Sequence, residues 1–465
     1  MAPAADGRPI SRRIADFAGS LRSDDIPKLV VKAAKDHLLD ALGVGLAASA
    51  LRTRPRIERA VLALGRGSES TGLGVAERLP APSAALLNGA LIHALEFDDT
   101  HIASVVHGST VVVPAALATA ERESATGARL LSAIVLGWEL FIRLGLAAPG
   151  TLQPYGFQVT AVAGPFAAAL AAAALMGLEP DAMTNAIGIA GSQAGGLFEF
   201  LANGSTAKHI HGGWPAHAGI VAAELARAGM SGPGTVFEGR FGFYRAYARS
   251  SQCAERLGVL IDDLGRTWHL PDAAFKAYPC CHYIQPFLEC LETILAQGIA
   301  AEAVETIYCH VPREEAPLIC EPWEAKLRPA SAYQAKWSLP YCLAARLLNG
   351  QLDVETFDRT ALDERLLSAA RMVRWTPVEH TGFPEHYSGR MELITRQSAR
   401  YTAEVRDVLG GPRRPFGDER LRQKFISNAS RRLTDNGVDR VLAAVSKIED
   451  APSLTPLGDA LHALR

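Results

Sequence analysis

The sequence predicts a mainly α protein in which a large helical domain is interrupted by a smaller α+β domain. The chain has 465 residues, more than one ordinary hydrophobic core supports, so about two domains are expected. Apolar residues recur at helical spacing from about Ile14 to Ser250, give way to strand-like runs after about Leu270, and return to helical spacing after Gly411. We therefore expect an all-helical domain over about residues 1–268 plus 407–465, and an inserted α+β domain over residues 269–406.

The first half of the chain is rich in alanine and leucine at helical spacing. Ile26 to Ala48 and Ala84 to Leu95 show this pattern. The most apolar segment, Val159 to Leu175, is alanine-rich and is broken by Gly164 and Pro165, which is typical of a buried helix rather than a membrane span. We expect helices throughout this half, and we expect no membrane partner.

The residues after Leu270 have a mixed pattern. Short β-branched or alternating runs predict strands at Val304 to Val311, Met372 to Trp375 and Ser398 to Val405. Helical periodicity predicts helices at Pro286 to Gln297 and Leu339 to Asn349. The last segment, from Arg420 to Leu464, is amphipathic helix that we expect to rejoin the first domain.

Composition excludes several classes of partner. The net charge is −2 and the pI is near neutral, so no basic surface is available to hold nucleic acid or an anionic membrane. The seven cysteines are odd in number and show no repeated Cys-x-x-Cys spacing, which favours a reduced, intracellular protein. No apolar stretch of signal-peptide length occurs between Met1 and Arg12, so we expect a cytoplasmic location.

A first cluster of chemically active residues runs from His93 to His101 and continues with His107 to Ser109. Its acids and imidazoles follow an apolar helix, where they can pass protons or bind a metal ion. Structural hydrogen bonding, general acid–base catalysis and metal binding are all compatible with the pattern. The metal hypothesis lacks thiolates or paired helical histidines, so we expect no metal site.

A second cluster extends from Gly204 to His217 and contains Lys208, His209 and His211. Small residues around these side chains let a substrate approach the backbone, and a lysine ammonium is a suitable partner for a carboxylate. The alternative is the start of a helix with solvated polar residues.

A third cluster, from Phe275 to His282, places Lys276 and His282 just before a predicted helix. The N-terminal amides of that helix would favour an anion. Cys280 and Cys281 suggest a thiol nucleophile, but adjacent cysteines between a proline and a helix are more often buried and unreactive.

In this order the three clusters resemble the MmgE/PrpD family, and the resemblance covers almost the whole chain. The matching motifs are residues 88–90, 97–101, 156–157, 164–166, 208–213, 237–239 with 242–243, Lys276 with 278–280, 335–341 and 424–425. The resemblance implies a helical domain with an inserted α+β lid, an active site in the cleft between them, a homodimer, and no metal or organic cofactor.

By motif position, the resemblance implies that His107, Lys208, Lys276 and Tyr341 are catalytic groups, with Glu96 and Thr100 lining the same pocket. Two positions depart from the family pattern. Glu96 stands where decarboxylase-like members have aspartate, and Gln158 stands where they have histidine. Gln158 lacks the positive charge that a histidine at this position could carry, and another imidazole can supply it. His101, His209 and His282 are therefore candidate substrate-binding residues together with Gln158.

The reactions of this family share a carbanion that forms beside a carboxylate. A cationic pocket stabilises such an intermediate, and lysine, histidine or tyrosine can move the proton. We expect a lyase, a dehydratase or decarboxylase of a small di- or tricarboxylic acid, with a racemase or epimerase as the alternative. A noncatalytic carboxylate-binding protein and a hydrolase that uses Cys280 or Cys281 are the remaining possibilities.

Overall fold

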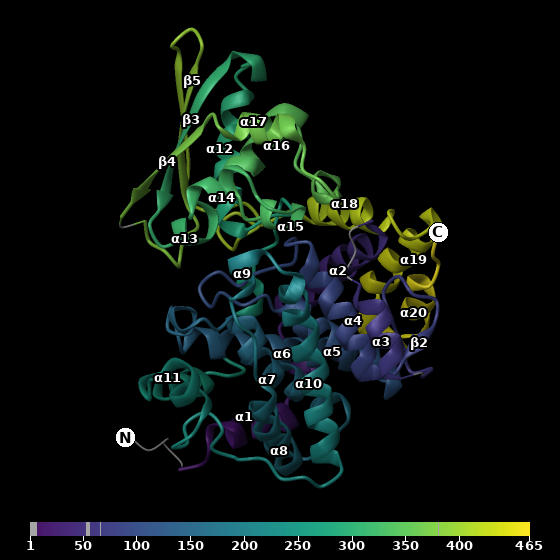
Figure 1. Ribbon diagram of the computed structural model, residues 1–465. Coiled ribbons are helices and arrows are strands. Elements are labelled where there is room, and N and C mark those ends of the chain that lie inside the picture. Colours follow the sequence, from purple (N-terminus) through teal and green to yellow (C-terminus); the bar gives the residue numbers. More distant parts are fainter. Residues whose placement is uncertain (1–6, 53–55, 66, 380) are drawn as a thin grey trace.

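A computed structural model describes residues 7–52, 56–65, 67–379 and 381–465. The chain forms a helical domain in the lower part of Figure 1 and an α+β domain above it. This arrangement confirms the expected mainly α fold of two domains. Residues 1–6, which belong to the N-terminal segment considered for a signal sequence, lie outside the described residues.

The helical domain is built from two separate stretches of the chain. The first stretch contains α1 (Ile10–Ser20), α2 (Lys28–Ala50), α3 (Ile57–Leu64), α4 (Ala81–Ala94), α5 (Ser109–Arg122), α6 (Gly127–Leu146), α7 (Val159–Leu175), α8 (Pro180–Ala190), α9 (Phe200–Asn203), α10 (Ile210–Arg227) and α11 (Gln252–Ile261). The second contains α18 (Asp418–Ala429), α19 (Asp435–Ser446) and α20 (Thr455–Leu461). As expected, the C-terminal helices return to the first domain, where α18 packs against α2 (Figure 1).

The α+β domain combines short helices with one mixed sheet. Its helices are α12 (Gln285–Leu295), α13 (Ala316–Ile319), α14 (Trp323–Leu327), α15 (Ala332–Ala335), α16 (Leu339–Asn349) and α17 (Glu364–Ala370). Its strands are β3 (Val304–Pro312), β4 (Val373–Val378), β5 (Gly389–Thr395) and β6 (Arg400–Val405). The strand order is β4-β3-β5-β6, with β4 parallel to β3 and the other neighbours antiparallel. Helix α12 packs on β5 and β6.

Two details differ from the expectation. Strand β5 was not predicted, although its apolar residues Met391 and Leu393 alternate with half-buried or exposed ones as in the other strands. The first half of the chain also contains a two-stranded hairpin, β1 (Ser70–Thr71) with β2 (Arg78–Leu79). Asn88 of α4 stabilises this hairpin by accepting a hydrogen bond from the Leu73 amide and donating one to the Thr71 carbonyl. Such a short pairing has no periodicity that a sequence pattern can reveal.

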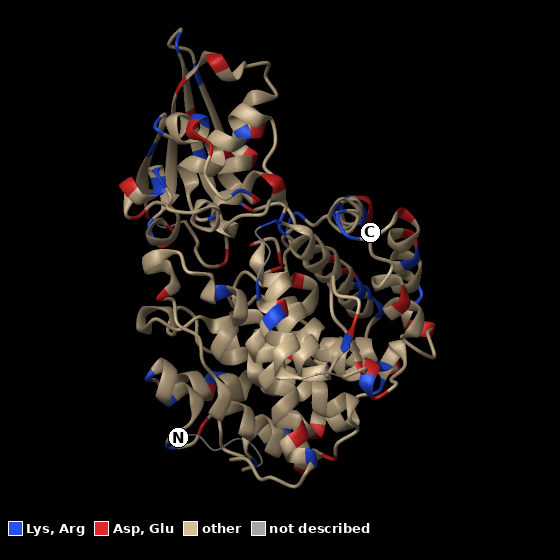
Figure 2. Cartoon of the chain, turned by 45° about the vertical axis from the view of Figure 1, so that its right-hand side comes forward, with Lys and Arg blue, Asp and Glu red and all other residues tan. Residues whose placement is uncertain are grey.

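Each domain has its own hydrophobic core. The larger core takes nearly all its residues from positions 10–273 and 425–461, and the smaller takes its residues from 274–408 together with Ile102. We propose domain boundaries near residues 268 and 407, as the change of periodicity suggests. Figure 2 shows that the helices inside the larger domain carry few charged residues, as expected for elements that are buried on most sides.

The crossing of α4 and α10 determines where the chemically active residues lie. A Cβ atom at Gly213 would lie 2.1 Å from the Leu86 carbonyl oxygen, and one at Gly89 would lie 2.7 Å from the Gly213 Cα atom. Only glycine therefore allows this close approach. It brings the end of α4, where the first cluster begins, beside the start of α10, where the second cluster lies.

None of the described helices is long and apolar enough to cross a membrane.

Candidate active site

The chain turns sharply at the end of α4, where Glu96 has a φ of 54°. This left-handed conformation is uncommon for a residue other than glycine and costs of order 1 kcal/mol. The carbonyl oxygens of residues 95, 96 and 97 accept hydrogen bonds from Lys336 (2.7 Å), Lys276 (3.1 Å) and Lys424 (3.0 Å), respectively. These carbonyls follow the end of α4 and are buried, where an unpaired carbonyl is costly, so the three lysine donors stabilise this turn.

Glu96 and Lys208 form a buried ion pair, with 2.5 Å between Oε1 and Nζ. Tyr333 donates a hydrogen bond of 2.9 Å to the same carboxylate oxygen, and Lys276 Nζ lies 3.9 Å from the other oxygen. Burial opposes ionisation of Glu96, but the two lysines outweigh it and lower its pKa to about 2. Burial also lowers the pKa of Lys208, which Glu96 and Asp98 only partly restore. The site therefore holds a carboxylate and two lysines in a small volume.

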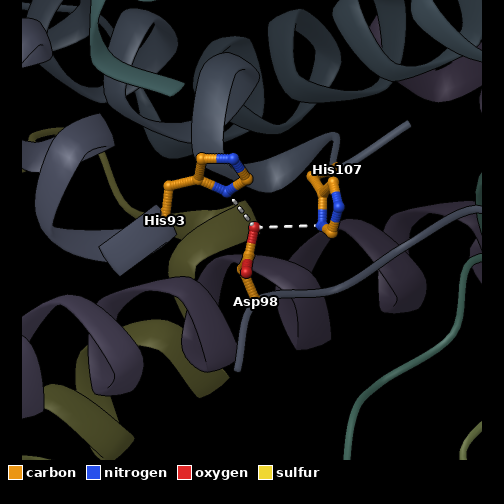
Figure 3. A group of neighbouring side chains, drawn as sticks. All are labelled: His93, Asp98 and His107. Atoms are coloured by element: carbon orange, nitrogen blue, oxygen red, sulfur yellow. Dashed lines mark hydrogen bonds and ion pairs between the residues drawn. The ribbon is translucent and has the colours of Figure 1, made fainter. Parts of the chain in front are cut away.

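Two histidines share one carboxylate oxygen beside this ion pair (Figure 3). Asp98 Oδ2 lies 2.8 Å from His93 Nδ1 and 3.2 Å from His107 Nδ1. The Asp99 carbonyl oxygen lies 3.1 Å from the same His107 nitrogen. Asp98 Oδ2 and this carbonyl can only accept, and the Thr100 hydroxyl at 3.3 Å can accept as well, so His107 Nδ1 carries the proton and its Nε2 is left as the basic nitrogen. Burial opposes ionisation of Asp98, but His107, His93 and Lys276 keep its pKa well below the usual range.

Gln158 connects this carboxylate network to α10. Its Nε2 lies 3.5 Å from His93 Nε2, and its Oε1 lies 2.5 Å from His211 Nδ1. Since His93 Nδ1–H donates a hydrogen bond to Asp98, its Nε2 is an acceptor, so the Gln158 amide donates to His93 and accepts from His211. Burial lowers the pKa of His93 to about 4 and that of His211 to about 3. Both imidazoles are thus neutral near pH 7, and Gln158 bridges them without adding charge.

Of these groups, Glu96, His107, Gln158, Lys208 and Lys276 line a small cavity of about 80 Å³ between the two domains. Its lining consists of Glu96, Thr100, Val105, His107, Gln153, Gln158, Val159, Phe198, Lys208, Lys276, Cys281, His282, Tyr283, Leu318, Trp337 and Tyr387. His282 is buried and has no hydrogen-bond partner for either ring nitrogen among the described residues. Burial, with Lys276 and His107 nearby, lowers its pKa well below the usual range. An unpaired imidazole in a cavity offers a hydrogen bond to a ligand.

Seven of the ten predicted site residues line this cavity, and three do not. The seven are Glu96, Thr100, His107, Gln158, Lys208, Lys276 and His282. His101 lines a neighbouring cavity of about 480 Å³, where its ring lies 6.3 Å from that of His269. His209 packs its ring edge-on against Tyr333, behind the cavity wall. Tyr341 lies near Phe357, with a distance of 6.4 Å between ring centroids.

Tyr333 was missed, although it contacts Glu96 directly. Its only sequence signal was its position two residues before the motif at residues 335–341, in which Tyr341 was the predicted catalytic residue. Residues 333 and 341 are both aromatic positions of short helices, and no periodicity distinguishes which one meets the carboxylate. Trp337, which was likewise not predicted, places its ring centroid 4.5 Å from Lys208 Nζ, in the geometry of a cation–π contact.

The two adjacent cysteines do not have the environment of nucleophiles. Burial raises the pKa of Cys281 to about 12 and that of Cys280 well above its usual value. A thiol in this state forms little thiolate at neutral pH, although Cys281 does line the cavity. The geometry therefore favours the unreactive alternative.

His93, Asp98 and His107 are also the one group within the described residues whose spacing could hold a metal ion, with ligand atoms all within 4.8 Å of one another. Two hydrogen bonds to Asp98 account for the same geometry, so we propose that protons join these groups. We expect activity to survive exhaustive dialysis against a chelator. Loss of activity that one divalent metal restores, with that metal bound in a 1:1 ratio, would contradict the proposal.

The structure defines a mainly α protein of two domains with a cavity between them that is lined by acids, lysines and imidazoles. Comparison with family models then identifies the family. Residues 12–256 match the MmgE/PrpD N-terminal domain, and residues 278–450 match the MmgE/PrpD C-terminal domain. The chain belongs to the MmgE/PrpD family.

Several relatives match along nearly their whole length. A cis-aconitate decarboxylase-like protein, oryM, of Aspergillus oryzae is 28% identical over 96% of each chain. The cis-aconitate decarboxylase of Aspergillus terreus is 26% identical over 97% of this chain and 96% of its own. That of Homo sapiens is 28% identical over 95% of this chain and 92% of its own. Family and relatives together support a lyase of the dehydratase or decarboxylase type at the level of the family.

Proposed function

We propose that this protein is a cofactor-independent lyase that removes or delivers a proton beside a carboxylate of a small di- or tricarboxylic acid. The observation that carries the proposal is the cavity itself. It combines Lys208 and Lys276 with His107, whose Nδ1 proton is held by Asp98. Positive groups and a base of defined tautomer are what the formation of a carbanion next to a carboxylate requires.

In the proposed mechanism, Lys208 and Lys276 bind a substrate carboxylate and stabilise the enolate-like intermediate. His107 Nε2 accepts the proton, because its other nitrogen is already a donor. The unpaired His282 supplies a hydrogen bond to a second polar group of the substrate. Each well-placed donor of this kind contributes of order 3 kcal/mol to the transition state. Lys208, whose pKa burial lowers, would protonate the departing hydroxide or the carbanion carbon. Proton exchange with solvent would then return His107 and Lys208 to their starting states.

The fate of the intermediate separates the lyase from its alternatives. After proton removal, loss of hydroxide gives dehydration, and reprotonation on the opposite face gives epimerisation. In decarboxylation the departing carbon dioxide itself leaves the electron pair on carbon, and a proton delivered to that carbon completes the reaction. The similarity to decarboxylases along nearly the whole chain favours a lyase over an epimerase. The small cavity also favours small acids as substrates.

Proton NMR in deuterium oxide tests the proposed function. Purified protein would be mixed with a panel of di- and tricarboxylic acids, and both products and deuterium incorporation would be followed. We expect one acid to yield an alkene or a decarboxylated product. Deuterium exchange with inversion alone would indicate the epimerase. Acids that bind without any exchange or turnover would indicate a noncatalytic carboxylate-binding protein.

Gln158 leads to a prediction about specificity. A histidine at this position can carry positive charge, whereas the glutamine amide cannot, so the pocket has one potential cation fewer than its relatives. We expect weak wild-type activity on cis-aconitate and 2-methylcitrate, and we expect Gln158→His to improve kcat/KM for these acids more than for the native substrate. Gln193→His, outside the cavity, serves as the control for a general effect of histidine. Efficient wild-type turnover that Gln158→His leaves unchanged or lowers would show that position 158 has another role.

We also propose that the protein is a cytoplasmic homodimer, as the family resemblance implies. Light scattering coupled to size-exclusion chromatography would decide between a mass near 49.6 kDa and twice that value.

A further inference from the structure

One short segment of the α+β domain reaches across to the helical domain at the active site. Within residues 333–337, Tyr333 bonds Glu96, Lys336 bonds the Leu95 carbonyl at 2.7 Å, and the Trp337 ring lies over Lys208. Glu96 and Lys208 both belong to the helical domain. The segment therefore contacts both members of the buried ion pair and the turn that carries one of them.

Contacts within the segment and with the helical domain fix the position of α15. Ser331 caps α15 by accepting a hydrogen bond of 3.1 Å from the Gln334 amide. The Gln334 side chain packs against Gly204, where a Cβ atom would lie 2.2 Å from Gln334 Cγ and where φ is +66°. Gly204 lies four residues before Lys208, so α15 is seated on the turn that leads to the lysine as well as on Glu96.

The hydroxyl of Tyr333 is suited to hold a carboxylate at any working pH. Burial, and then Glu96 itself, raise its pKa well above the usual value, so the hydroxyl keeps its proton and donates. It shares Glu96 Oε1 with Lys208, while Glu96 Oε2 has no hydrogen-bond partner in the described part of the chain. Without the hydroxyl, Lys208 would be the sole hydrogen-bond donor to that carboxylate.

We propose that Tyr333 is a positioning residue of the active site, whose hydroxyl takes up part of the Glu96 charge and so leaves the Lys208 ammonium available to a substrate carboxylate. Because Tyr333 comes from the α+β domain, this arrangement exists only while the two domains are docked. The inference rests on the proposed function in one respect, namely that Lys208 binds the substrate.

The test measures Lys208 directly, so that it does not depend on turnover. NMR of protein that carries lysine labelled with ¹³C at Cε, with the Lys208 signal assigned by its loss in Lys208→Arg, follows the titration of this buried amine without a reagent and reports its pH midpoint. In Tyr333→Phe the ring remains but Glu96 loses a donor. Its charge then acts more strongly on Lys208, so we expect the midpoint to rise by about 0.5 pH unit or more.

Two further variants make the test specific. 3-Fluorotyrosine at position 333 is a stronger donor of nearly the same shape, and we expect it to lower the midpoint. In a Glu96→Gln background the effect of Tyr333→Phe should vanish, as a double-mutant cycle requires. Tyr244→Phe is the matched control, since it also removes a buried hydroxyl with a 2.9 Å hydrogen bond, here to the Leu144 carbonyl.

The outcomes separate this inference from the proposed function. A shifted midpoint together with about tenfold lower kcat/KM for an acid that the wild type turns over supports both. A shifted midpoint in a protein that turns over none of the acids supports the positioning of Lys208 but contradicts the lyase. An unchanged midpoint in both Tyr333 variants would overturn the proposal and leave Tyr333 as a packing residue, whatever the activity.

Discussion

Replacement of Lys208 by alanine is expected to lower kcat at least about 100-fold, and replacement of Lys276 to have an effect of the same size. Each change removes a cation from the cavity in which negative charge develops, and loss of one catalytic donor has consequences of this order. Steady-state kinetics at saturating substrate would measure the effect, with Lys447→Ala on the exposed surface as the control. Near-normal kcat in either variant would show that its lysine makes only a uniform binding contact.

The structure changes one part of this prediction. Replacement of a solvent-exposed lysine would leave folding largely intact. Lys208 is instead the closest cation to Glu96, with both side chains buried, and removal of one partner of a buried pair leaves the other charge uncompensated. We therefore expect Lys208→Ala to lower the melting temperature. The double variant Lys208→Met with Glu96→Gln should recover stability but not activity.

Substitution of His107 by glutamine is the second change for which we expect a large loss, again about 100-fold or more in kcat. Glutamine retains hydrogen bonding but cannot accept a proton from carbon near neutral pH. Asp98→Asn should also be slow, because an amide can present a donor to His107 and reverse the tautomer. His310→Gln, on β3 and away from the cavity, controls for the loss of an imidazole.

Activity and melting temperature of His107→Gln and Asp98→Asn together show whether His107 is a catalytic base or a structural residue. A catalytic His107 predicts lower kcat with a melting temperature close to that of the wild type, since its ring faces a cavity and is partly accessible. If His107→Gln retains most of its activity, His282 becomes the remaining imidazole of the cavity that can serve as the base. Deuterium exchange into substrate would then be lost in His282→Gln instead.

Much of the fold followed from local periodicity. Leu339–Asn349 was predicted with its observed ends, and the strand predicted at Val304 to Val311 differs from β3 by one residue. Strand β5 was missed although its apolar residues alternate, and its place in the sheet depends on pairing with β3 residues that lie 80 or more positions earlier in the chain. The site followed from motifs in the same way: Glu96, His107, Lys208 and Lys276 lie on separate segments, yet each stands in a recognisable cluster.

The sequence by itself therefore determined the family, the mainly α architecture, and the set of lysines, acids and imidazoles from which the cavity is made. Only the tertiary structure decided which of these side chains meet. Tyr333 rather than Tyr341 reaches Glu96, and His101 lies in a different cavity from His107. The reason is that spacing along the chain governs which face of an element a residue occupies, whereas contacts across the two domains depend on how those faces dock.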